Sequence, residues 1–165
     1  MKLKVLFVVV LCLGLQSVWA ETVLPWGADV PWQMKYVQPE EWVDPVVDGA
    51  GRKWTQLGYD DSQWETLTGP MANNYNQEHV DIFNYTWKGD DKCFYLRRTF
   101  TLDQVNSDGY TFATIHDDEI QVYINGQLVI DGRHAIEYFE SFFLDSSLFH
   151  DGENQLAIYY VGGPG

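Results

Sequence analysis

The chain has 165 residues, with 10 Lys and Arg against 24 Asp and Glu, and a formal net charge of −14 at pH 7. This length corresponds to roughly one domain, and the 45% hydrophobic and 16% aromatic content supplies enough apolar surface for a packed core, which excludes disorder throughout. The negative charge repels phosphate backbones, so it argues against nucleic acid as a partner.

The first twenty residues predict a secretory signal peptide. Lys2 and Lys4 are followed by an almost wholly apolar run over residues 5–15, and the small residue Ala20 ends the segment. The apolar run is too short to cross a membrane as a helix, which takes about 20 residues. We expect cleavage after Ala20, which places residues 21–165 in a periplasm, at a cell surface or in the medium. Lipidation at Cys12 is the weaker alternative.

Processing would leave a strongly acidic domain with one cysteine. Loss of Lys2 and Lys4 leaves 8 basic and 24 acidic side chains, a net charge of −16. Cys93 alone cannot form an intrachain disulfide, so a large apolar core has to hold the fold. No general-base signature surrounds Cys93, and a buried strand thiol is favoured over a nucleophile.

The first half of the domain predicts irregular structure. Residues 21–50 form a lead-in rich in Pro and Trp, which argues against a long helix or a central strand and favours extended pieces on the surface. Residues 46–69 predict a turn and a short helical or irregular segment around Asp60-Asp61-Ser62. Residues 70–91 are polar with interspersed aromatics and no period, which is typical of a long functional loop.

The second half predicts strands over 93–102, 110–116, 120–124, 127–130, 138–144 and 155–161. Between the third and fourth of these, Asn125-Gly126 is typical of a two-residue type I′ hairpin. That turn would pair Val122 with Val129 and Tyr123 with Leu128, giving a ribbon with apolar groups on both faces that is covered on both sides. Short strands joined by Gly, Asn and Asp turns indicate an all-β fold, an antiparallel β-sandwich or jelly roll, in one domain over 21–165.

Four segments, in this order, carry a resemblance to a known family: Gly58-Tyr59-Asp60-Asp61-Ser62-Gln63-Trp64 with Leu67 and Pro70, Tyr95-Leu96-Arg97-Arg98-Thr99-Phe100, His116-Asp117-Asp118-Glu119-Ile120-Gln121-Val122-Tyr123-Ile124-Asn125-Gly126, and Gly152-Glu153-Asn154-Gln155-Leu156-Ala157. Over about residues 54–161 the chain resembles the galactose-binding-like β-sandwich at the N-terminus of glycoside hydrolase family 2 enzymes and related accessory domains of secreted, often gut-bacterial, carbohydrate-active proteins.

The resemblance implies an accessory domain without catalytic residues, because in such enzymes the catalytic carboxylates lie in a separate barrel. Relatives also continue through one more closing strand, whereas here Gly162-Gly163-Pro164-Gly165 follow Val161. We therefore expect that the C-terminal strand is missing, and that one sheet has an unpaired edge open to aggregation or to strand donation by a partner. Further domains of a parent protein are expected partners.

The residues themselves also argue against catalysis. The four histidines lack the spacing of a zinc site, and no Gly-x-Ser-x-Gly elbow is present. Trp54 and Trp64 are expected to fill a core. Arg97 and Arg98 face opposite sides of one strand, where packing or an acidic partner is favoured over ligand contact.

A carbohydrate site is predicted in the long loop, because sugars bind exposed aromatic rings flanked by amide and carboxylate groups. The candidate residues are Asn73, Asn74, Tyr75, Asn76 and Trp87. A plain polar surface loop is the alternative interpretation.

Asp117 and Asp118 precede the hairpin, where they either accept backbone N–H bonds or hold a structural calcium ion. No other cofactor is expected. The sequence thus favours a non-catalytic carbohydrate-binding or accessory module with a glycan as partner. The alternative is a structural or interaction domain of a larger surface protein without a sugar site.

Overall fold

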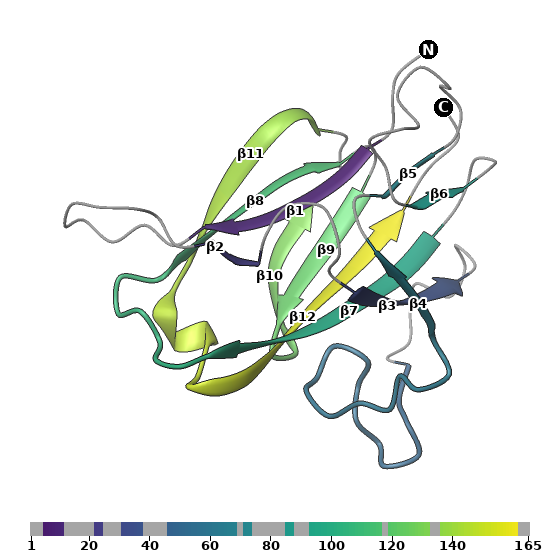
Figure 1. The fold of residues 1–165 in the computed structure, drawn as a ribbon, viewed down its shortest axis with the longest axis horizontal. Helices are drawn as coiled ribbons and strands as arrows, with labels where there is room; N and C mark the ends of the chain where they lie inside the picture. Colours follow the sequence, from purple (N-terminus) through teal and green to yellow (C-terminus); the bar gives the residue numbers. More distant parts are fainter. Residues whose placement is uncertain are drawn as a thin grey trace.

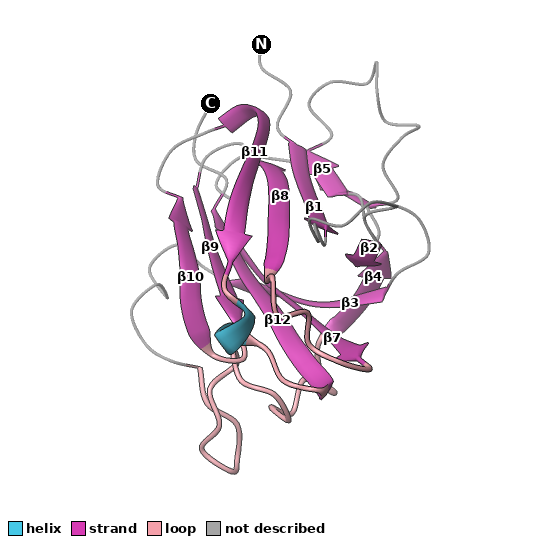
Figure 2. Cartoon of the chain, turned by 90° about the vertical axis from the view of Figure 1, so that its left-hand side faces the viewer, coloured by secondary structure: helices cyan, strands magenta, loops and turns pink. Residues whose placement is uncertain are grey.

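The computed structural model describes residues 5–11, 22–24, 31–37, 46–68, 71–73, 85–87, 93–116, 119–132 and 136–161. In this part of the chain the fold is all-β, with two sheets packed face to face and a single 3₁₀ turn, η3 (Ser146–Leu148) (Figures 1 and 2). The predicted antiparallel β-sandwich is confirmed.

Sheet II is antiparallel throughout. Its strands, in spatial order, are β10 (Gln127–Gly132), β9 (Glu119–Ile124), β12 (Gly152–Val161), β7 (Cys93–Leu102), β3 (Pro31–Val37) and β4 (Glu65–Thr68). The two central strands, β12 and β7, pair without interruption from Gly152 opposite Leu102 to Val161 opposite Cys93. This long pairing places β7 and β12 at the centre of sheet II.

Sheet I is less regular. Its strands, in spatial order, are β11 (Ile136–Leu144), β8 (Tyr110–His116), β1 (Val5–Leu11), β5 (Met71–Asn73) and β6 (Tyr85–Trp87), and β2 (Thr22–Leu24) pairs with β1. The pairing of β5 with β6 is parallel and the others are antiparallel. Strand β1 lies inside the predicted signal peptide, so cleavage after Ala20 would remove it. That cleavage stays a prediction.

The main core fills the space between the sheets. Sheet II contributes one face of β7 with Phe94, Leu96, Phe100 and Leu102, as the alternation of the sequence predicts. Sheet I contributes residues such as Phe112, which is 0% exposed. A second apolar cluster lies on the opposite, outer face of sheet II, so its central strands β7 and β12 are buried on both faces.

The predicted hairpin is present, but its register differs. Asn125 and Gly126 have φ of 50° and 85°, as a type I′ turn requires, and Tyr123 lies opposite Leu128. Val122, however, lies opposite Ile130 instead of Val129, because a bulge interrupts the ladder between Leu128 and Ile130. The prediction that the ribbon is covered on both sides is also wrong, since Leu128 is 45% exposed.

Two predictions for the first half need correction. Strand β3 lies between β7 and β4 instead of on the surface, which is compatible with its proline because Pro31 is its first residue and needs no ladder hydrogen bond from its nitrogen. The predicted long loop contains β5 and β6, and β4 follows the irregular segment. None of the described residues forms a helix with the length and apolarity that a membrane crossing requires.

Candidate functional site

The outer face of sheet II is covered by residues 46–64, which we call the cap. The Trp54 ring of the cap stacks on Tyr95 of β7, with centroids 4.3 Å apart and planes 20° apart. Trp64 lies 6.2 Å from the same ring. Trp54 is buried and Trp64 is half-buried against this cluster. The prediction that both tryptophans pack in a core is therefore confirmed.

Asp48 organises the cap by accepting four hydrogen bonds. Its Oδ1 accepts from the backbone N–H of Ala50 and of Arg52, both at 2.9 Å. Its Oδ2 accepts from Nε of Arg52 at 2.8 Å and from the backbone N–H of Asp60 at 3.1 Å. Desolvation by burial opposes ionisation, but these bonds outweigh it and lower the pKa of Asp48 to about 2. One carboxylate thus ties both ends of the cap together.

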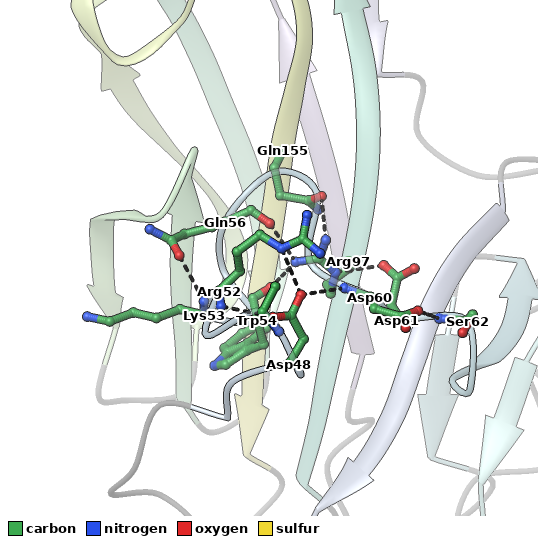
Figure 3. A network of polar contacts seen from close by, with 11 residues as sticks. Asp48, Arg52, Lys53, Trp54, Gln56, Asp60, Asp61, Ser62, Arg97 and Gln155 are labelled. Carbon is green, nitrogen blue, oxygen red and sulfur yellow. Dashed lines mark hydrogen bonds and ion pairs between the residues drawn. The ribbon is translucent and has the colours of Figure 1, made fainter.

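Arg97 of β7 joins the cap to the sheet (Figure 3). Its side chain is 2% exposed, and its Nε donates to Oδ2 of Asp61 at 2.7 Å. Nη1 donates to the backbone carbonyls of Trp54 and Gln56, and Nη2 donates to Oε1 of Gln155 at 2.9 Å. The planar guanidinium therefore donates hydrogen bonds to acceptors on the cap and on β12, two segments that are far apart in the sequence.

Aromatic rings complete the surroundings of Arg97. Its guanidinium carbon lies 4.9 Å from the centroid of Tyr59 and 5.9 Å from that of Trp64, within the range of cation–π attraction. Burial raises the pKa of the Tyr59 hydroxyl. Arg97 is thus enclosed by an acid, carbonyls and aromatic rings, which confirms that its contacts are internal packing and an acidic partner.

Arg98 faces the other side of β7. Its guanidinium carbon lies 5.8 Å from the centroid of Trp32, and burial lowers the pKa of this half-buried group. The two adjacent arginines therefore use opposite sides of the strand, as the alternation of a strand requires.

A cleft of about 520 Å³ opens where the cap meets sheet II. It is lined by residues of β3, the cap, β7 and β12, namely Pro31, Gln33, Leu57, Gly58, Tyr59, Asp61, Arg97, Arg98, Thr99 and Glu153. Its floor is rigid, because β3, β7 and β12 are neighbours in one sheet. Of its polar groups, Thr99 and Glu153 are exposed and Gln33 and Asp61 are half-buried.

The cleft offers both hydrogen-bond donors and acceptors. Arg97 occupies Oδ2 of Asp61 and thereby fixes the carboxylate, whose second oxygen is an acceptor. Oε1 of Gln33 accepts from the Thr66 hydroxyl at 3.2 Å, which identifies Nε2 as the remaining donor of this amide. Glu153 adds an acceptor and Thr99 a hydroxyl. This combination suits a polyhydroxylated ligand better than an apolar one.

The structure tests the predicted carbohydrate loop only in part. Asn73 is the last residue of β5 and Trp87 is the last residue of β6, and these two residues lie opposite each other in the parallel pairing. Asn74, Tyr75 and Asn76 lie outside the described residues. The loop site therefore stays a prediction, with two of its members in neighbouring strands.

The predicted calcium ligands, Asp117 and Asp118, also lie outside the described residues, between His116 of β8 and Glu119 of β9. Elsewhere in the described part of the chain, no three His, Cys, Asp or Glu side chains are close enough to hold a metal ion. Cys93 is 0% exposed, so the prediction of a buried strand thiol is confirmed. Burial raises the pKa of the neighbouring Tyr159 hydroxyl.

None of the cleft residues was predicted from the sequence to bind a ligand. Asp61 and Gln155 lie 36 and 58 residues from Arg97 in the sequence, and no local spacing links them. Arg97 shares its face of β7 with Tyr95 and Thr99, so the alternation of the strand gave no sign that this arginine has a buried acidic partner.

The chain matches no known protein-family model, and no curated protein matches it in sequence. Among solved structures, a beta-glycosidase from Bacteroides vulgatus matches 81% of this chain with a TM-score of 0.47 and 17% identity. The chain spans 16% of that protein.

Proposed function

We propose that this chain is a non-catalytic accessory module of a secreted carbohydrate-active protein, and that it binds glycan in the cleft between the cap and sheet II. The observation that carries the proposal is the cleft itself, in which Gln33, Asp61, Thr99 and Glu153 surround a space of about 520 Å³. The resemblance of the sequence to galactose-binding-like accessory domains supports the same class of ligand.

The chemistry of the cleft fits sugar hydroxyls, which both donate and accept hydrogen bonds. Asp61 and Glu153 act as acceptors and Nε2 of Gln33 as a donor. The ion pair with Arg97 holds Asp61 before a ligand arrives, so little side-chain order is lost on binding. Tyr59 contributes part of the wall. We assign no catalytic role to these acids.

The test is a glycan-array screen of the purified chain, followed by titration calorimetry on any hit. We expect Glu153→Gln, which replaces a charged acceptor by a neutral one, and Gln33→Ala, which removes a donor, each to weaken binding at least about tenfold. Glu140→Gln on β11 is the matched control and should leave the affinity unchanged. Absence of binding to every glycan by a folded sample would refute the proposal.

The same titration separates the cleft from the predicted loop. Trp87→Ala removes the aromatic ring that the loop site needs and leaves the cleft residues intact. Binding lost in Trp87→Ala but retained in Glu153→Gln would move the site to the loop around Asn73. A requirement for calcium that Asp117→Asn abolishes would assign the metal to Asp117 and Asp118.

A structural or interaction domain is the second candidate, and one observation favours it. The aromatic side chains of the cap and Arg97 make their contacts with other residues of this protein, as expected of residues that only hold a fold together. If Glu153→Gln, Gln33→Ala and Trp87→Ala all keep the stability of the parent chain while no glycan binds, this second function replaces the first.

A further inference from the structure

We propose that the edge of β8 that faces β1 is a strand-acceptor site, filled in the processed protein by an extended apolar segment of another polypeptide. The proposal is independent of the glycan site. It joins a prediction with an observation: the sequence predicts that β1 belongs to a signal peptide, and the structure places β1 in the middle of sheet I.

The register of β1 defines the site. Five residue pairs join β1 to β8, from Phe7 opposite Ile115 to Leu11 opposite Thr111. β1 also pairs with β5, through Val5 opposite Ala72 and Leu6 opposite Met71, and with β2, through Val10 opposite Leu24 and Leu11 opposite Thr22. The slot thus accepts a single strand that runs antiparallel to β8, β5 and β2.

Removal of residues 1–20 would expose the edge of β8. Backbone N–H and C=O groups along 111–115 would lose their strand partner, and unpaired edges recruit other strands. The same strand carries Phe112 and Thr114, both 0% exposed in the interior. Water would then reach the backbone beside a buried core, which makes refilling of the slot favourable.

The shape and charge of the slot select the occupant. Because β5 and β2 bound the slot as well as β8, a lone strand fits, whereas the edge of a second sheet could not enter without separating these strands. The strand that lies there has the sequence VLFVVVL, so the occupant is apolar, β-branched and free of proline. The net charge of −16 after cleavage favours basic residues beside this strand.

The experiment uses the full chain with a protease site placed within residues 13–19, cut after folding. Amide hydrogen exchange is followed at residues 111–115 before cutting, after removal of the released leader, and after addition of a peptide carrying residues 1–12. The matched control peptide contains Val8→Pro, which removes one ladder N–H and clashes with pairing.

We expect protection of these amides in the uncut chain, a loss of at least about tenfold after removal of the leader, and recovery with the parent peptide but not with the Val8→Pro peptide. If the depleted chain aggregates, the parent peptide alone should prevent it. Three results would overturn the proposal: no protection in the uncut chain, unchanged protection in a monomer without the leader, or protection through a dimer, which would make a second copy the occupant.

Discussion

The two sheets differ in how their centres are built. In sheet II, β7 and β12 pair over their full length, and these two strands are buried between the interior and the cap. In sheet I, the central strand is β1, which belongs to the predicted leader, and β5 and β6 each have three residues. The comparison indicates that sheet II and the cap hold the fold, while sheet I depends on a strand that processing would remove.

The largest expected effect comes from separating the cap from sheet II. Arg97→Met keeps the bulk of the side chain but leaves Asp61, Gln155 and two backbone carbonyls without their donor. We expect a loss of about 3–4 kcal/mol in the free energy of unfolding, measured in urea, because unpaired buried polar groups are costly.

Arg98→Met is the matched control for this comparison. Arg98 stacks on Trp32, and we expect its replacement to cost about 1 kcal/mol or less. Equal losses of stability in both variants would mean that the ion pair of Arg97 contributes no more than a cation–π contact. The two faces of β7 would then not differ in how much their arginines stabilise the fold.

A second pair of substitutions probes the turn that leads into sheet I. Gly109 has φ of 78°, and an added Cβ would lie 2.6 Å from the carbonyl oxygen of Leu144 and 2.8 Å from the Phe143 ring. Gly152, at the start of β12, has φ of 87° but open space around it. We expect thermal unfolding to report about 2–3 kcal/mol for Gly109→Ala and about 1 kcal/mol for Gly152→Ala.

If the two glycine variants lose the same stability, the backbone conformation alone sets the effect and the close packing of β11 on the turn at Gly109 contributes nothing. A larger loss for Gly152→Ala would reverse the comparison.

Asn125 connects the hairpin to the loop before β12. Its Nδ2 donates to the Leu148 carbonyl at 3.0 Å and to Oδ1 of Asn154 at 2.8 Å, and its Oδ1 accepts from the Gln155 N–H at 2.8 Å. Asn125→Gly keeps the positive φ and removes these bonds. We expect a loss of about 1–2 kcal/mol in urea unfolding. No loss would show that water replaces the amide without penalty.

Local patterns predicted β7, β9, β10 and β12 of sheet II, because strand and turn signals are local. The alternation of 93–102 and the Asn125-Gly126 turn both correspond to observed structure. The bulge after Leu128 was missed because Val129 and Ile130 are equally apolar, so the pattern favours neither register. Strand β3 was missed because the proline and tryptophan content of its surroundings outweighed its own alternation.

The cleft could not be predicted, because it depends on the association of four distant segments. No local sequence pattern indicates that Asp61 pairs with Arg97. None indicates that Asp48 accepts the hydrogen bonds that hold the cap together. Short strands such as β5 and β6 have too few residues to show a period. Sequence patterns thus identified the strands, while tertiary pairing determined the site.

The smallest expected effect is a pH dependence confined to the cap. The folded-state pKa of Asp48 is lowered from 3.8 to about 2, so its stabilising contribution is fully present above about pH 4 and is lost as the pH falls toward 2.

The side chain that Asp48→Asn introduces cannot ionise. The stability difference between the parent chain and this variant should therefore be constant from pH 7 to about pH 4 and should shrink below it, as urea midpoints at pH 6, 4, 3 and 2 would show. Asp145→Asn is the comparator, because hydrogen bonds from Ser147 lower the pKa of Asp145 at a site outside the cap. Trp54 and Trp64 lie in the cap, so their fluorescence reports on the cap. Because Asp145 lies outside the cap, the change of this fluorescence with acid should be the same in Asp145→Asn as in the parent chain. If the parent chain remains more stable than Asp48→Asn by the same amount at pH 2, the charge of Asp48 does not hold the cap on sheet II. The asparagine would then destabilise the cap because its amide cannot accept the same hydrogen bonds in the same geometry.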